Sequence, residues 1–252
     1  MTEQRFLRLE KTEGVFGPTL QGEGVNIGMP VSFVRLYGCD FRCSWCDTPF
    51  SLGKDKGGEW LLLKADEIIS RLGEIGCKNV VVSGGNPLIQ PKPALEEFFT
   101  RLVERGYWIQ VETQGSIFPS PIVLHMTDFW SLSPKLPSAG KMESENWKAV
   151  NTFIIKVPSK ALQLKFVVSN LVDYNYIKMR LVSDLVTEHR NVPIILQPEG
   201  MQLEKFDINY YRNRLDYLCG LVGNDLSFWG NYKDVRVLPQ LHKVIWDIQR
   251  KR

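Results

Sequence analysis

Long apolar runs, charge of one sign and a disulfide pattern are all missing from this 252-residue chain. Because no run of about 18 apolar residues and no basic leader with an apolar stretch is found, we expect neither a membrane span nor a secretory signal. The 31 basic and 28 acidic residues give a net charge of +3, which indicates no nucleic-acid partner. Five cysteines, an odd number with three clustered, argue against a disulfide framework. These absences predict a cytoplasmic protein.

The clustered cysteines are Cys39, Cys43 and Cys46, with the spacing C-x3-C-x2-C directly after an apolar run. Three thiolates on so short a loop can bind one metal centre together. A structural zinc site normally takes four protein ligands, and no fourth Cys or His is close in the sequence. A 4Fe–4S cluster explains the number three, because its fourth iron is then open to a small molecule. The alternative is a loop of buried or zinc-bound thiols.

Short apolar runs that end in small, polar or basic residues recur along the chain and are typical of β-strands. They cover residues 31–37, 79–82, 107–111, 129–132, 164–168, 192–196 and 235–238. Strands of this kind, separated by helices, build a mostly parallel sheet. In such sheets the functional residues follow the carboxyl ends of the strands, where the cysteines also lie.

Helical spacing marks several of the intervening segments. One predicted helix is stopped by Gly106 and presents the apolar face Leu95, Phe98, Phe99, Leu102 and Val103. Another ends ahead of Gly76, and weaker patterns cover residues 174–190 and 208–222. We therefore expect an α/β fold of one domain over residues 1–252, with its core at about 14–242. The expected architecture is an incomplete TIM-like barrel of parallel strands with helices outside.

Motifs spread along nearly the whole chain resemble one enzyme family of the radical S-adenosylmethionine (SAM) superfamily. The cysteine spacing is the signature of the superfamily, and the other motifs are much more specific. From about residue 14 to residue 242 the chain resembles the 7-carboxy-7-deazaguanine synthase family. The motifs that carry the resemblance are residues 16–24, 35–39, 43–48, 83–87, 112–115, 133–135 and 238–242.

The resemblance implies a lyase of queuosine and 7-deazapurine biosynthesis. Such an enzyme contracts the ring of 6-carboxy-5,6,7,8-tetrahydropterin to 7-carboxy-7-deazaguanine with loss of ammonia. The implied cofactors are a 4Fe–4S cluster, SAM and Mg²⁺. The implied partners are the pterin substrate, a flavodoxin- or ferredoxin-like electron donor and a second copy of the chain.

The resemblance also assigns cofactor-binding residues. Cys39, Cys43 and Cys46 would hold the cluster, and Thr48 would be a Mg²⁺ ligand. The residues expected at the SAM site are Trp45, Cys46, Asp47, Gly85, Ser133, Pro134, Lys135 and Gln197. For Gly85, a strand end without a side chain lets the backbone approach a ligand closely, although a simple turn is the alternative. For Trp45, ordinary core packing is the alternative.

The expected substrate-binding residues are Leu20, Gln21, Gly22, Glu23, Arg35, Ser83 and His242. Arg35 stands in an otherwise apolar strand, and a guanidinium offers a carboxylate two parallel hydrogen bonds. A salt bridge from Arg35 to a protein Asp or Glu is the alternative. Glu23 would accept hydrogen bonds from the guanidine-like edge of the pterin, while a solvated loop carboxylate is the competing view.

Two other functions are compatible with the cysteines alone. A radical SAM activase that acts on a glycine of a partner protein would share them, but it has no use for residues 20–24, Arg35 or His242. A zinc-binding interaction module without catalysis is the second alternative. Iron and sulfide in the anaerobically purified protein would exclude the zinc module.

Overall fold

A single ten-stranded sheet forms the centre of the computed structural model, which describes residues 3–53, 59–140, 147–183, 191–200 and 206–246. The strand order is β10-β9-β8-β7-β6-β5-β3-β1-β4, with β2 paired to β3 off this path. The strands are β1 (Leu7–Glu10), β2 (Val15–Leu20), β3 (Pro30–Leu36), β4 (Trp60–Leu63), β5 (Asn79–Gly84), β6 (Trp108–Thr113), β7 (Phe129–Leu132), β8 (Leu162–Val168), β9 (Ile194–Pro198) and β10 (Val235–Val237).

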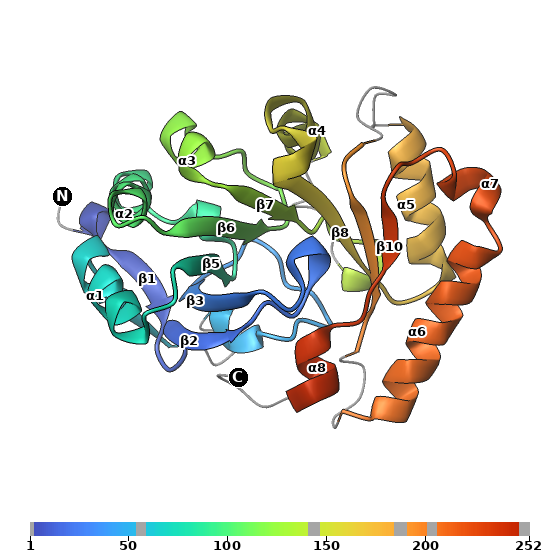
Figure 1. Cartoon of the computed structure of the whole chain (residues 1–252), viewed down its shortest axis with the longest axis horizontal. Coiled ribbons are helices and arrows are strands. Elements are labelled where there is room, and N and C mark those ends of the chain that lie inside the picture. Colours follow the sequence, from blue (N-terminus) through green and yellow to red (C-terminus); the bar gives the residue numbers. More distant parts are fainter. Residues whose placement is uncertain (1–2, 54–58, 141–146, 184–190, 201–205, 247–252) are drawn as a thin grey trace.

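Every strand expected from an apolar run is present, as β3 and β5 to β10, and neighbours in this series pair in parallel. The remaining strands β1, β2 and β4 were not expected, and they extend the sheet by antiparallel pairing. The parallel strands curve into an open barrel, as Figure 1 shows, so the predicted incomplete barrel is confirmed.

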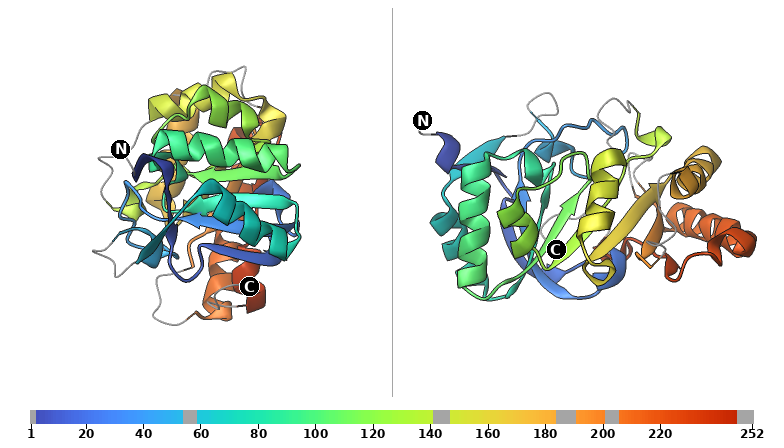
Figure 2. Two further views of the ribbon diagram at one scale, coloured as in Figure 1. Left: turned by 90° about the vertical axis from the view of Figure 1, so that its left-hand side faces the viewer. Right: turned by 90° about the horizontal axis from the view of Figure 1, so that it is seen from above.

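Helices lie on the outer side of the curved sheet, which two further views make clear (Figure 2). They are α1 (Ala65–Ile75), α2 (Lys92–Glu104), α3 (Pro121–Met126), α4 (Trp147–Lys156), α5 (Leu171–Ser183), α6 (Ile208–Gly223) and α7 (Leu226–Trp229). The short helix α8 (Leu241–Trp246) lies instead at the cavity, which His242, Lys243 and Trp246 line. The predicted helix over 174–190 begins at Leu171, and residues 184–190 lie outside the described residues. Among the described residues, no helix combines the length and apolar character needed to span a bilayer.

The apolar face predicted for α2 is mostly correct. Phe98, Phe99 and Leu102 are fully buried against the sheet, but Val103 is 47% exposed. A helix turns about 100° per residue, so Val103 lies about 80° around from Leu95, at the edge of the buried face. Of the five residues on the predicted apolar face, Val103 alone is exposed.

Polar side chains occupy the inner face of the barrel in a transverse row. Side chains alternate between the faces of a strand, and the outward residues pack under the helices in the core. On the inner face, Arg35 is in register with Ser83, and Ser83 Oγ donates to Glu112 Oε2 at 2.9 Å. Glu112 is in register with Ser131, which is in register with Gln163. The fold therefore supplies a polar interior before any ligand is bound.

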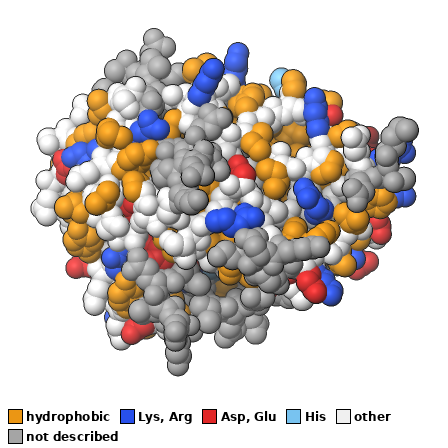
Figure 3. Space-filling model, turned by 180° about the vertical axis from the view of Figure 1, so that it is seen from behind, with side chains coloured by type: hydrophobic (Ala, Val, Ile, Leu, Met, Phe, Trp, Pro, Cys, Tyr) orange, Lys and Arg blue, Asp and Glu red, His pale blue; other side chains and the backbone are white. Residues whose placement is uncertain are grey.

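Where Figure 3 draws described residues, the side seen from behind shows no concentration of one charge. Basic, acidic and apolar side chains of the described residues are interspersed there (Figure 3). This distribution agrees with the net charge of +3.

Core packing under α4 generates a stability prediction. Phe153 is fully buried, with ring centroids 4.9 Å from Phe118 and 5.0 Å from Trp130. We expect Phe153→Ala to lower the free energy of unfolding by about 3–5 kcal/mol, through lost burial and the cavity left behind. Ile155 on the same helix is 59% exposed, so Ile155→Ala should change the free energy of unfolding by less than about 0.5 kcal/mol. Urea unfolding of the two variants checks this, and similar losses in both would contradict it.

Candidate active site

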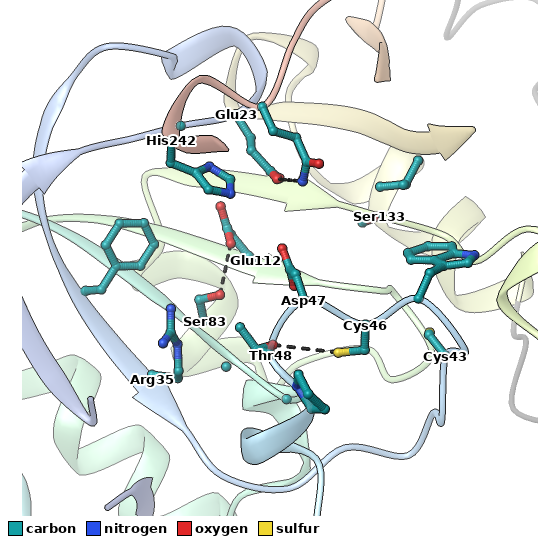
Figure 4. Close-up of a pocket in the computed structure, with 18 of the residues that line it drawn as sticks. Glu23, Arg35, Cys43, Cys46, Asp47, Thr48, Ser83, Glu112, Ser133 and His242 are labelled. Carbon is teal, nitrogen blue, oxygen red and sulfur yellow. Dashed lines mark hydrogen bonds between the residues drawn. The ribbon is translucent and has the colours of Figure 1, made fainter. Parts of the chain in front are cut away.

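A cavity of about 460 Å³ opens at the carboxyl ends of the parallel strands. This volume is in the range of small-molecule sites. All of the residues predicted from the sequence for the cluster, SAM, Mg²⁺ and substrate line it, except Pro134 and Gln197. Figure 4 shows the cysteine loop on one side of this cavity and Glu23 with His242 on the other.

The cysteine loop follows β3, and its three thiols are free and half-buried. The Phe41 amide donates to Cys39 Sγ at 3.4 Å, and Cys46 Sγ lies 3.7 Å from Thr48 Oγ1. Burial raises the pKa of Cys39 and of Cys46 to about 11. A metal centre must therefore displace protons when these thiols bind it as thiolates.

This donor set fits a three-cysteine iron–sulfur cluster. Three free thiols share one wall, and N–H groups are directed at sulfur, which suits an anionic cluster. His242 also lines the cavity, but it lies with Glu23 and Asp47 rather than completing a four-ligand set with the cysteines. The donor geometry therefore gives no support to a tetrahedral zinc site.

Two glycines at the end of β5 let the cysteine loop approach the sheet. A Cβ on Gly85 would lie 1.9 Å from the Gly38 carbonyl oxygen, and one on Gly84 would lie 2.0 Å from the Leu36 carbonyl oxygen. The Asn86 amide donates to the Gly38 carbonyl at 2.8 Å. The glycine pair thus has a structural cause, the close contact of two backbones, in addition to its place on the cavity wall.

The aromatic wall beside the cysteines is held by polar contacts. Trp45 Nε1 donates to Ser138 Oγ at 3.0 Å, and Lys135 Nζ lies 5.6 Å from the centroid of the Trp45 ring. Lys135 Nζ also donates to Ser133 Oγ at 3.3 Å. Trp45 is half-buried and lines the cavity, so it is not an ordinary core residue.

Gln197 and Pro134 are the predicted SAM contacts that do not line the cavity. The Gln197 side chain is fully buried on β9, and neither its amide oxygen nor its amide nitrogen has a hydrogen-bond partner among the described residues. Pro134 directly follows Ser133 on the same loop. The assignment of both residues to SAM stays a prediction.

Glu23 is placed by the two glycines on either side of it. A Cβ on Gly22 would lie 2.2 Å from His242 Nδ1, and one on Gly24 would lie 2.1 Å from Gln163 Nε2. Gly24 also has a φ of +73°, which a residue with a side chain rarely adopts. The Gly-Glu-Gly sequence therefore lets this loop pack closely against β8 and the first turn of α8.

The Glu23 carboxylate is ion-paired with Lys165, and its other oxygen accepts a hydrogen bond from Gln240 Nε2 at 2.5 Å. Burial alone would raise the pKa of Glu23, but Lys165, His242 and Gln240 outweigh it and hold the pKa well below its usual range. Burial alone would lower the pKa of Lys165, but the Glu23 and Glu112 carboxylates raise it. Both groups are therefore charged at neutral pH, and Glu23 is not a solvated loop carboxylate.

Asp47 and His242 point toward Glu23, as Figure 4 shows. One ligand atom from each of the three side chains lies within 4.8 Å of the others. Thr48, the predicted Mg²⁺ ligand, lines the same cavity. Carboxylate oxygens are the ligands that Mg²⁺ prefers, and the Glu23 carboxylate is already paired with Lys165, so Asp47 is the carboxylate that can complement Thr48 as a cation ligand.

Arg35 has a protein partner. Its Nη1 is ion-paired with Glu13, and the guanidinium carbon lies 5.0 Å from the centroid of the Phe16 ring and 5.4 Å from that of Phe50. The salt bridge that stood as the alternative is therefore present. Arg35 also lines the cavity, so its further donors can still serve a ligand carboxylate.

Several cavity residues were not expected from the sequence. Glu112 links Ser83 to Gln21, which donates to Glu112 Oε1 at 3.0 Å. Lys165 is a charged residue in an apolar strand, the same signal that pointed to Arg35, and it was overlooked. Further polar residues of this kind include Glu13, Gln114, Glu199, Gln240 and Lys243.

Comparison with known proteins agrees with this geometry. Residues 33–123 match the family model of the radical SAM superfamily. The 7-carboxy-7-deazaguanine synthase of Bacillus subtilis is 31% identical over 94% of this chain and 96% of its own length. That of Pyrobaculum aerophilum is 39% identical over 90% of this chain and 91% of its own length.

The crystal structure of QueE from Escherichia coli has the same fold. Its TM-score is 0.61 at 22% identity, and the match covers 92% of this chain and 93% of that one. The sequence relatives, matched over almost their whole length, show that the chain belongs to the 7-carboxy-7-deazaguanine synthase family of the radical SAM superfamily.

Proposed function

We propose that this protein contracts 6-carboxy-5,6,7,8-tetrahydropterin to 7-carboxy-7-deazaguanine with loss of ammonia, with a 4Fe–4S cluster and SAM as cofactors. The observation that carries the proposal is that one cavity holds three free thiols, an ionised glutamate and an arginine. The product serves queuosine or another 7-deazapurine, and we place the reaction in the cytoplasm.

The cysteine loop would hold the cofactors. Cys39, Cys43 and Cys46 are the cluster ligands, and Trp45 with Lys135 would cover SAM and keep water from the cavity. When bound, the cluster and SAM would supply one-electron chemistry and hydrogen abstraction. The protein itself contributes binding, orientation and exclusion of water.

The opposite wall would orient the pterin. Glu23, ionised and fixed by Lys165 and Gln240, would accept from the guanidine-like edge of the pterin. Gln21 and Glu112 lie beside it and add an amide and a carboxylate. Arg35 would bind the substrate carboxylate while it stays paired with Glu13. These contacts would place the carboxylate-bearing carbon toward the cysteine loop.

A Mg²⁺ ion is part of the proposal, with Thr48 and Asp47 as its protein ligands beside the substrate carboxylate. A homodimer and a flavodoxin- or ferredoxin-like electron donor are also proposed, from the family resemblance alone. The activase alternative gains no support, because the polar wall around Glu23 suits a small heterocycle rather than a protein glycine. The zinc module is disfavoured by the three-thiol donor set.

Anaerobic reconstitution tests the proposal directly. The protein should be loaded with iron and sulfide and incubated with SAM, a chemical reductant and 6-carboxytetrahydropterin. Mass spectrometry should detect 7-carboxy-7-deazaguanine and ammonia release. A loaded protein that cleaves SAM but leaves the pterin unchanged would contradict the substrate assignment.

Loss of one cluster ligand should abolish the cofactor site. We expect Cys43→Ala to lose the iron–sulfur absorbance and SAM cleavage, because among the described residues no cysteine other than the three ligands lines the cavity. Cys77 is the matched control, since its Sγ lies near the Pro30 and Asn79 carbonyl oxygens at the amino end of β5. Cys77→Ala should keep both signals, and equal loss in the two variants would refute the ligand assignment.

Substrate recognition by Arg35 predicts a separation of binding from radical generation. Arg35→Lys keeps a charge beside Glu13 but loses the planar fork. Hydrogen bonds to charged groups contribute about 1.5–3 kcal/mol, so apparent substrate affinity should fall by roughly ten- to a hundredfold. Cluster content and substrate-free 5′-deoxyadenosine formation should stay at wild-type levels. Wild-type turnover at low substrate would rule out the carboxylate contact, and cluster loss would show that Arg35 is structural.

The buried ion pair predicts a pH-dependent stability. In the wild type its contribution is present above the ordinary Glu23 pKa of 4.5 and is lost as the pH falls through the lowered pKa. Lys165→Met leaves a buried carboxylate without its cation, which should cost about 3–5 kcal/mol at pH 7. Burial is the largest influence on the Glu23 pKa and raises it, so without Lys165 we expect the carboxylate to take up a proton more readily and this loss to shrink between pH 8 and pH 5.

Urea unfolding of the apoprotein across that pH range measures the effect. The double variant Lys165→Met/Glu23→Gln is the control, because removing both charges removes the penalty of an unpaired one. It should recover most of the lost stability. A pH-independent loss without recovery would mean that Lys165 acts through packing.

A further inference from the structure

A set of hydrogen-bonded polar side chains adjoins the cysteine loop, and one of its members, Gln114, also lines the cavity. At its centre is Asp40, which directly follows the cluster ligand Cys39. Its Oδ1 accepts from Asn86 Nδ2 at 3.0 Å and from Gln114 Nε2, and its Oδ2 accepts from Ser116 Oγ at 2.6 Å. Three donors from the ends of two neighbouring strands therefore converge on one carboxylate.

The donors are themselves fixed and nearly inaccessible to water. Asn86 is fully buried, and Gln114 and Ser116 are 6% and 8% exposed. The Asn86 amide oxygen accepts from Thr113 Oγ1 at 3.0 Å. Buried and fully bonded, this set has little freedom to rearrange around the loop.

One member of the set also reaches the cluster ligand. Gln114 Nε2 lies 3.9 Å from Cys39 Sγ, within range of a hydrogen bond to sulfur. The same amide nitrogen therefore bonds the sulfur of Cys39 and the carboxylate of Asp40, and couples the two.

We propose that Asp40 and Gln114 are positioning residues that fix Cys39 and set the reduction potential of the cluster in opposite directions. This inference rests on the proposed three-cysteine cluster. Reduction adds negative charge to a cluster, and hydrogen bonds to its sulfurs and nearby charges change the free energy of that step. The Asp40 carboxylate disfavours the added electron and lowers the potential. The Gln114 N–H stabilises it and raises the potential.

The opposite signs distinguish tuning from simple structural support. Asp40→Asn removes the charge with little change of shape, and we expect cluster reduction to become about tenfold more favourable. Gln114→Leu removes the donor to Cys39 Sγ, and we expect reduction to become about tenfold less favourable. For a one-electron couple, tenfold corresponds to about 59 mV. If the substitutions merely loosened the loop, the shifts in reduction potential at these two positions would not have opposite signs.

The experiment is an anaerobic redox titration of the reconstituted holoprotein, followed by absorbance and electron paramagnetic resonance, with iron and sulfide counted per chain. Asp128→Asn is the matched control, since this carboxylate accepts the Ile109 amide at 2.8 Å near the amino end of β6, away from the cysteines. Its potential should equal that of the wild type.

The outcomes separate this inference from the proposed function. A loaded wild type with unshifted potentials in Asp40→Asn and Gln114→Leu, or shifts of the same sign, overturns the inference and leaves the function standing. If Asp40→Asn does not assemble a cluster, the test rests on Gln114→Leu. A cluster reduction potential in Gln114→Leu that is not lower than that of the wild type then overturns the inference. A wild type that assembles no cluster overturns both.

Discussion

The ion pair between Glu23 and Lys165 is the interaction on which the arrangement of the site depends. It joins the loop after β2 to the middle of β8, two segments far apart in the chain, across the interior of an open barrel. Gln240 adds a third segment from the start of the last helix. Both charges are buried, and either one alone would be costly to desolvate. The two side chains must therefore stay in contact. The same contact that joins these segments also fixes the carboxylate that faces the cavity.

The cysteine side of the cavity is built by a different device, close backbone contact. Gly84 and Gly85 have no side chains, so the end of β5 lies directly against the end of β3 and the loop that follows it. Backbone amides of β5 and the residues after it then donate to carbonyl oxygens of this neighbouring segment. Asp40 and its three donors extend this contact to β6. The cofactor side is thus held by backbone proximity and neutral donors, whereas the substrate side is held by charge.

Much of the fold follows from local sequence, because each parallel strand is a mainly apolar run followed by polar or small residues. The strands β1 and β2 escaped prediction for local reasons. β1 alternates leucine with charged residues, and β2 contains the Gly17-Pro18 pair, which reads as a turn. No such reason applies to β4, which is an apolar run of the same length as β7. Of the site, the cysteines and Arg35 could be found because their residue types contrast with their surroundings. Lys165 showed the same contrast within β8, while the partners Glu13 and Glu112 depend on tertiary pairing that no local pattern reveals.

The polar row across the barrel interior, from Arg35 through Ser83 and Glu112 to Ser131 and Gln163, has a consequence for turnover. In water, dipoles around a reacting heterocycle must rotate whenever its charge distribution changes. Here the dipoles on the cavity side of that row are already hydrogen-bonded to one another and cannot rotate freely. The interior acts as a solvent of fixed orientation with a small reorganisation energy. The cost of aligning these dipoles is met when the chain folds and is not repeated in each catalytic cycle.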